Sequence, residues 1–207
     1  MLLHKGHTNV VKLLVDKYGA AIDGLTFEWN YLCSYSSTKK GSVAVIKGLM
    51  KFDPKLVTTA RSKNNSTALH QAASGGNAEV VQVLLESGSN PSDETDEGYT
   101  ALHLAAKYGH VEVLHALKSA MSWRTASKKK TGLTALHVAA SYGQEDFVRE
   151  MLTQVPATIP SERPVDSPEA DYGFTPLHMA ARHGREDVVR MLLNSAVCKW
   201  MLRLLLR

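Results

Sequence analysis

The sequence contains few of the features that mark secreted, membrane-spanning or strongly charged proteins. Its 207 residues include two cysteines, Cys33 and Cys198, which stand too far apart for a disulfide framework or a metal-binding pair. No apolar run approaches the roughly 18 residues that a membrane-spanning helix needs, and no secretion signal opens the chain. The formal net charge of +4 is too small to indicate nucleic-acid binding. We expect a soluble intracellular chain that binds no nucleic acid and does not insert into a membrane.

Motifs of catalysis are missing as well. The sequence contains no phosphate-binding loop, no nucleophile elbow and no separated pair of acidic residues. We therefore expect neither an enzyme nor a cofactor. The composition is 44% hydrophobic and 21% charged, which is typical of a chain that folds.

One motif, Thr-x-Leu-His, recurs four times, and the same pattern follows each copy. The motifs begin at Thr67, Thr100, Thr134 and Thr175, so their spacings are 33, 34 and 41 residues. Each is followed by a pair of alanines, by a glycine nine residues after the threonine, and by an apolar block such as 80–85. Repeats of this period are typical of solenoids, in which each unit buries its apolar face only against its neighbours.

The chemistry of the pattern predicts a pair of antiparallel helices in each repeat. Threonine is a good N-cap residue, and Pro176 in the last copy suits the first turn of a helix. The alanines allow a close neighbour, and the glycine permits the left-handed turn that ends the first helix. The Val/Leu block then forms the buried stripe of a second helix.

These features resemble the ankyrin repeat, which implies an all-α solenoid of helix-turn-helix units joined by β-hairpins or turns. About four good repeats, one degenerate repeat and one half repeat are expected. The units are a half repeat at 1–22, a degenerate repeat at 23–62 that is irregular over 27–40, repeats at 63–95, 96–129, 130–170 (with a Pro-rich loop at 154–170) and 171–196, and an atypical tail at 197–207.

The tail does not continue the repeat pattern, because residues 197–207 are basic and apolar where a polar hairpin should begin. Trp200 and Met201 each have a single codon, and reading their codons in a shifted frame yields an aspartate. We therefore expect a reading-frame shift here and a chain that is part of a longer array. The alternative is an amphipathic tail that caps the last repeat or touches a membrane surface.

One histidine in each motif raises the possibility of a metal site, but the geometry argues against it. Stacked helices lie about 8–10 Å apart, whereas zinc ligands must converge to about 2 Å from the ion. We expect no metal, and we expect buried imidazoles that bond the backbone at the base of the hairpins. These histidines are His70, His103, His137 and His178.

A candidate partner-binding surface follows from the residues directly before each helix-ending glycine, which should point away from the core. Together with hairpin residues they are expected to line one concave side of the stack, where tyrosine and arginine suit a protein interface. The candidates are Lys107, Tyr108, Ser141, Tyr142, Arg182 and His183, with Tyr99 and Tyr172 from the hairpins. The alternative is that they are ordinary surface residues of an array whose role is mechanical.

Three non-consensus stretches carry a finer resemblance. The segments 41–53, 111–119 and 132–162, the last with its proline-rich loop, are similar to the middle of the ankyrin array of the no-mechanoreceptor-potential-C channels, the TRPN branch of transient receptor potential channels. The similarity runs from about Gly41 to Ala196 and omits 27–40 and the tail.

This resemblance implies a cytoplasmic elastic spring beneath a tetrameric cation pore, on the cytoplasmic side of the plasma membrane. It also implies protein partners, namely microtubules and sister channel subunits. The pore itself is absent from this sequence. The alternative function is a stand-alone ankyrin adaptor or scaffold that binds one protein through Tyr108, Tyr142 and Arg182.

Overall fold

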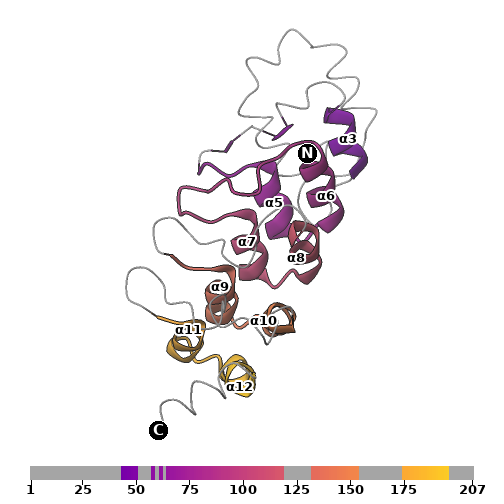
Figure 1. The fold of residues 1–207 in the computed structure, drawn as a ribbon. Helices are drawn as coiled ribbons and strands as arrows, with labels where there is room; N and C mark the ends of the chain where they lie inside the picture. Colours follow the sequence, from indigo (N-terminus) through magenta and orange to yellow (C-terminus); the bar gives the residue numbers. More distant parts are fainter. Residues whose placement is uncertain are drawn as a thin grey trace, which may run out of the picture.

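The fold is a stack of antiparallel helix pairs arranged in two rows (Figure 1). The computed structural model describes residues 43–50, 57–58, 61–62, 64–118, 132–153 and 174–195. The expected half repeat at 1–22, the irregular segment 27–40, the Pro-rich loop 154–170 and the tail 197–207 lie outside these ranges. None of the helices in the described part of the chain has the length and apolarity required to span a membrane.

The first helix of each repeat belongs to one row, which we call the first-helix row. It consists of α5 (Ala68–Gly75), α7 (Ala101–Tyr108), α9 (Ala135–Tyr142) and α11 (Pro176–Arg182). Each helix of this row contacts the next one along the stack. The alanine pairs of α5, α7 and α9 are fully buried, and their small side chains let neighbouring helices approach closely.

The second helices form the other row, which we call the second-helix row. It consists of α6 (Ala78–Glu86), α8 (Val111–Lys118), α10 (Glu145–Thr153) and α12 (Glu186–Asn194), and α3 (Val43–Met50) packs against α6. The predicted apolar stripe is confirmed, because Val80, Val81 and Leu84 of α6 are fully buried. In α12 the stripe is only partly covered, and Leu193 remains 39% exposed.

The left-handed turns predicted between the two helices are confirmed at three glycines. Gly76, Gly109 and Gly143 have φ angles of 76°, 76° and 75°, a conformation that costs glycine little because it lacks a Cβ. In the last repeat His183 follows the end of α11 as the C-cap, and Gly184 takes the positive φ one residue later.

The described segments form an all-helical repeat solenoid and contain no β-strand. The connection between α6 and α7 is a compact turn, in which Gly98 N–H donates to Thr95 O at 2.8 Å and Thr95 N–H donates to Tyr99 O at 3.0 Å. The predicted fold class is therefore confirmed, with this connection built as a turn.

Candidate functional site

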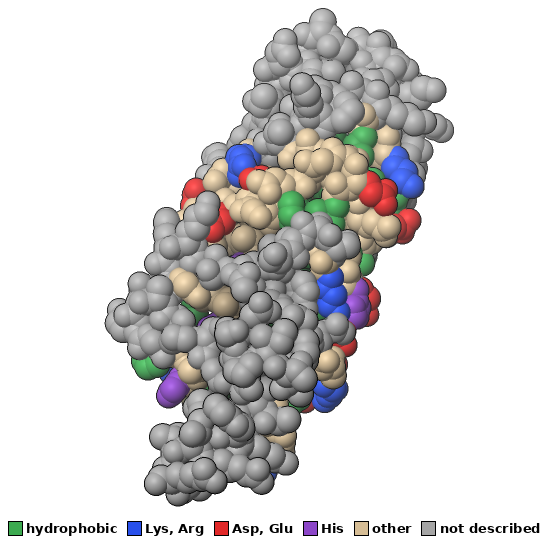
Figure 2. Space-filling view, viewed as in Figure 1, with side chains coloured by type: hydrophobic (Ala, Val, Ile, Leu, Met, Phe, Trp, Pro, Cys, Tyr) green, Lys and Arg blue, Asp and Glu red, His purple; other side chains and the backbone are tan. Residues whose placement is uncertain are grey.

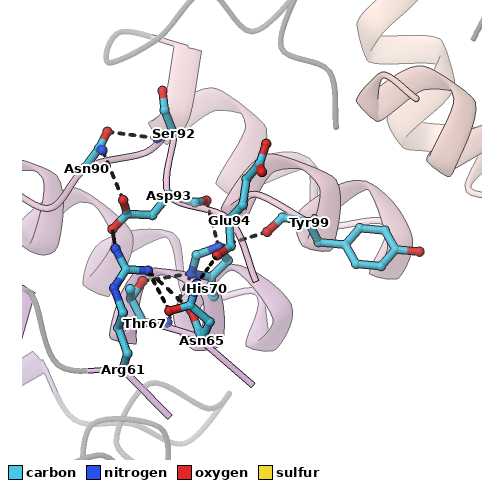
Figure 3. A network of polar contacts seen from close by, with 9 residues as sticks. All are labelled: Arg61, Asn65, Thr67, His70, Asn90, Ser92, Asp93, Glu94 and Tyr99. Atoms are coloured by element: carbon cyan, nitrogen blue, oxygen red, sulfur yellow. Dashed lines mark hydrogen bonds and ion pairs between the residues drawn. The ribbon is translucent and has the colours of Figure 1, made fainter. Parts of the chain in front are cut away.

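Three of the motif histidines bond the start of their own helix to the segment that leads into the next repeat. All four threonines are N-caps with extended backbone, and each forms a capping box with the histidine three residues later. Nδ1 of His70 accepts the backbone N–H of Thr67 at 3.1 Å, while its Nε2 lies 3.0 Å from the carbonyl oxygens of Asp93 and Tyr99. Figure 3 shows this imidazole between its own helix start and the next turn. The same Nε2 contact joins His103 to Leu133 O and His137 to Phe174 O.

These contacts fix the protonation of His70. Because Nδ1 accepts a backbone N–H, the ring proton stays on Nε2 and is donated to the carbonyl oxygens. Burial lowers the pKa of His70 below its ordinary value of 6.5, and the carbonyls of Tyr99 and Asp93 oppose this only in part. Among the residues that the structure describes, no three His, Cys, Asp or Glu side chains gather where they could hold a metal ion.

The prediction of buried histidines is confirmed for His70, His103 and His137 but is wrong for His178. His178 makes the same contact with the backbone N–H of Thr175, at 3.2 Å, yet its side chain is exposed. His178 lies in the last helix pair that the structure describes, where the described first-helix neighbour of α11 is α9 on one side. The motif sets the hydrogen bond, and the neighbouring repeat sets the burial.

A second set of contacts between repeats was not foreseen from the sequence. The residues directly after Gly109, Gly143 and Gly184 each reach back to a carbonyl near the end of the preceding first helix. His110 Nε2 lies 3.0 Å from Ser74 O, Gln144 donates to Lys107 O at 2.9 Å, and Arg185 donates to Ser141 O at 3.1 Å. These bonds satisfy carbonyls that a helix end leaves without partners. The signal was present in the sequence as a long polar side chain after each of these glycines.

We call the bonds of His110, Gln144 and Arg185 the ladder. They give the glycines a second role. A Cβ at Gly143 would lie 2.9 Å from Cδ of Arg185, and one at Gly76 would lie 2.8 Å from Nδ1 of His110. The glycine therefore permits the turn and also leaves room for the side chain of the next repeat.

Four of the predicted partner-binding residues form one group, which we call the tyrosine cluster: Tyr99, Lys107, Tyr108 and Tyr142. Nζ of Lys107 lies 5.6 Å, 5.7 Å and 5.3 Å from the ring centroids of Tyr99, Tyr108 and Tyr142, within cation–π range. The ring of Tyr108 is 50% exposed and that of Tyr142 is 41% exposed, while Tyr99 is half-buried. The structure thus brings together side chains from two neighbouring repeats.

The electrostatics of the tyrosine cluster follow from this packing. Burial raises the pKa of Tyr99, and the nearby Tyr142 and Glu97 raise it further against the opposing charge of Lys107. Burial alone would lower the pKa of Lys107, but Tyr142, Tyr108 and Tyr99 outweigh it and the pKa is raised. Lys107 is therefore a cation and Tyr99 a neutral phenol at physiological pH.

The remaining predicted site residues lie elsewhere. Ser141 does not point away from the core as expected: it is buried, and its hydroxyl donates to Val138 O at 2.9 Å within its own helix. Arg182 is exposed, with Cζ 6.0 Å from the ring centroid of Phe174. His183 is also exposed, and its Nδ1 lies 2.9 Å from Met179 O. Tyr172 lies outside the described residues.

Charges of both signs are scattered over the face shown in Figure 2 rather than gathered into one patch. The ion pairs lie away from the tyrosine cluster. Arg61 pairs with Asp93 at 2.9 Å beside the first connection, and Lys118 of α8 pairs with Glu150 of α10 at 3.1 Å. The second pair joins adjacent repeats along the second-helix row.

The comparisons with known proteins agree with this architecture. A family model described as ankyrin repeats, in three copies, matches residues 32–125 and 115–201. No curated protein matches the chain. Ankyrin-repeat proteins are generally interaction modules for other proteins rather than enzymes, and no catalytic family is indicated. Because the matched residues cover well over half of the sequence, the chain belongs to the ankyrin-repeat family.

Proposed function

We propose that this chain binds a protein partner through the tyrosine cluster, in the manner of an ankyrin adaptor or scaffold. The observation that carries this proposal is the grouping of three tyrosines around Lys107, with Tyr108 and Tyr142 about half exposed. Tyrosine is enriched among the residues that contribute most to protein interfaces. Each ring offers a large apolar face and a hydroxyl that forms hydrogen bonds.

The cluster is also held in place before any partner arrives. Tyr99 is anchored by its backbone, whose carbonyl accepts from His70, while its ring points away from that network (Figure 3). Lys107 is anchored by its own carbonyl, which accepts from Gln144 of the next repeat. A surface whose side chains are already ordered loses less conformational entropy on binding.

Site-specific photocrosslinking tests this proposal. A photoreactive phenylalanine analogue replaces Tyr142 in one variant and Arg149, an exposed residue of α10 on the second-helix row, in the control. We expect protein adducts in cell extracts from the Tyr142 position and few or none from the Arg149 position. Equal adducts from both positions, or none from Tyr142, would contradict a partner at the tyrosine cluster.

The second candidate function is an elastic tether, by resemblance a piece of the cytoplasmic gating spring of a TRPN channel. One observation favours it: the ladder bonds of Gln144 and Arg185 each join one repeat to the next. Small rotations at such interfaces add along a solenoid, so the stack deforms like a spring. Here the buried interface leucines, such as Leu102 and Leu136, carry the function.

In this second function the protein partners are microtubules and sister channel subunits, and the location is the cytoplasmic side of the plasma membrane. Pulling on the two ends of the chain in an optical trap tests the elastic behaviour. We expect reversible extension at low force before any repeat unfolds. Abrupt unfolding with no preceding elastic phase would count against the tether.

A further inference from the structure

The charge of the first-helix row points to the chemistry of the partner. Resting on the proposed function, we infer that the partner contributes an extended, acidic peptide segment. One anionic side chain of this segment meets Lys107, a second meets Arg182, and Tyr142 contacts the residues between them. The anionic groups are the carboxylates of Asp or Glu, and a phosphorylated peptide serves as the comparison in the experiment.

The helices of the first-helix row contain no acidic residues. The sequences of α5, α7, α9 and α11 contain no Asp or Glu, whereas their charged side chains are Lys107 and Arg182. The acidic residues of the later repeats instead begin the second helices, as in Glu145 of α10 and Glu186 of α12. The two rows therefore differ in charge, and the first-helix row is complementary to an anionic ligand.

The two cations of this row differ in their surroundings from most of the other cations described. Within the described ranges no carboxylate forms an ion pair with Lys107 or Arg182, although Arg61, Lys118, Arg149 and Arg190 all have one. Both cations instead lie against aromatic rings, at 5.3 Å from Tyr142 for Lys107 and 6.0 Å from Phe174 for Arg182. An ammonium and a guanidinium held over rings keep N–H donors for an incoming oxygen anion.

The distance between Lys107 and Arg182 sets the length of the peptide segment. Lys107, Tyr142 and Arg182 occupy the ends of α7, α9 and α11, three consecutive helices in one row (Figure 1). Packed helices lie about 8–10 Å apart, so the two cations stand roughly 16–20 Å from each other. An extended peptide rises about 3.3 Å per residue, and about six residues cover this distance. The ligand is therefore a segment with two anionic residues about six positions apart.

One acidic side chain lies near the proposed path. Glu97, in the turn before α7, is close enough to Tyr99 that its charge helps to raise the pKa of that phenol. It stands at the Tyr99 side of the cluster, while Tyr142 and Arg182 lie on the following repeats. Removing this charge should strengthen the binding of an acidic peptide. Glu97→Gln is therefore expected to change the affinity in the opposite direction from Lys107→Met.

A displayed library of random 12-residue peptides tests the inference with the full 207-residue chain as bait. Peptides that bind the wild type are screened against the double variant Tyr108→Ala/Tyr142→Ala, and those that depend on the tyrosines are sequenced. We expect them to be rich in Asp and Glu at a separation of about six residues. The best peptide is then synthesised with Glu, Gln or phosphoserine at its acidic positions, and each dissociation constant is measured by fluorescence anisotropy.

For the Glu peptide we expect Lys107→Met to weaken binding roughly three- to tenfold, as for a charge-assisted contact, and Glu97→Gln to strengthen it. Arg149→Gln, which removes one positive charge from the second-helix row, should change the dissociation constant less than about twofold. Circular dichroism confirms that each variant is folded. A phosphoserine peptide that binds more tightly than the Glu peptide would overturn carboxylates as the anions of the segment.

The outcomes separate the inference from the proposed function. Tyrosine-dependent peptides without acidic residues, or equal losses from Lys107→Met and Arg149→Gln, overturn the acidic segment and leave the tyrosine cluster as a binding surface. Recovery of no tyrosine-dependent peptide at all contradicts the proposed function together with the inference that rests on it.

Discussion

The repeat built from α9 and α10 and the last described repeat, α11 and α12, share one motif but not one environment. Leu136 and His137 are fully buried in the first of them. The corresponding residues of the second, Leu177 and His178, are half-buried and exposed. Both threonines nevertheless form the same capping box with their histidines. The motif therefore determines the local conformation, whereas burial depends on how the neighbouring repeats pack against it.

This difference explains how a solenoid distributes its stability. A repeat with two neighbours gains packing energy from both, and one with a single packed neighbour gains roughly half as much. The same substitution should therefore have unequal effects at equivalent positions of the two repeats.

The largest effect is expected from the leucine of the motif. Leu136→Ala should lower the free energy of unfolding by roughly 2–5 kcal/mol, because it opens a cavity at a fully buried site. Leu177→Ala should cost less, about 1 kcal/mol, since that side chain is only partly buried. Urea denaturation followed by circular dichroism measures both. Equal losses would show that α11 is packed as tightly as α9.

A smaller contrast is expected at the glycines after the first helices. Gly143→Ala and Gly184→Ala both place a side chain at positive φ, which costs about 1 kcal/mol. At Gly143 the new Cβ also collides with Arg185, whose bond to Ser141 O is worth about another 1 kcal/mol, while nothing lies within 4 Å of a Cβ at Gly184. Thermal unfolding of the two variants measures the difference. If Gly184→Ala proves the more harmful, the ladder contributes nothing.

Acid should weaken the buried contacts of His70. Burial lowers the pKa of His70 in the folded protein below its ordinary 6.5, so the folded state binds fewer protons than the unfolded state there. The stabilisation that the neutral His70 ring contributes to the fold is thus fully present above pH 6.5 and is lost as the pH falls through the lowered pKa. His70→Gln keeps a capping-box residue that does not titrate. Urea denaturation from pH 7.5 to 5 should show a shallower loss in this variant, and an equally steep loss would contradict the assignment.

Much of the fold was predictable because each signal was local. The threonine caps, the left-handed glycines and the apolar stripe of the second helix depend on residues only a few positions apart, and the structure confirms them. The contact of Gln144 with Lys107 O joins residues 37 positions apart, and no local rule prescribes it. Only the repetition of a long polar residue after each of these glycines could have revealed it.

The candidate site was predicted less completely, for a geometric reason. Positions next to each other on a helix point about 100° apart, so two adjacent residues seldom face the same way. Tyr142 is exposed as expected, but Ser141 turns into the packed side of α9. The burial of His178 was overestimated because the motif was treated alike in every repeat. The charge difference between the two helix rows became visible only when the helices were placed side by side.

The smallest effect on stability is expected for Tyr142→Ala, within the same repeat as Leu136. The residue is 41% exposed, and its described contacts lie at the surface. They are the cation–π interaction with Lys107, worth about 0.5–1 kcal/mol at such a site, and hydrogen bonds with Tyr99 and Lys107 that water can replace. The variant should therefore unfold within about 1 kcal/mol of the wild type in urea, yet lose most of its binding to tyrosine-dependent peptides. Leu136→Ala, examined at a temperature where it is still folded, should keep that binding because it leaves the exposed rings in place. A Tyr142→Ala protein that unfolds as readily as Leu136→Ala would show that this ring belongs to the packing between repeats, and the binding surface would then have to lie elsewhere.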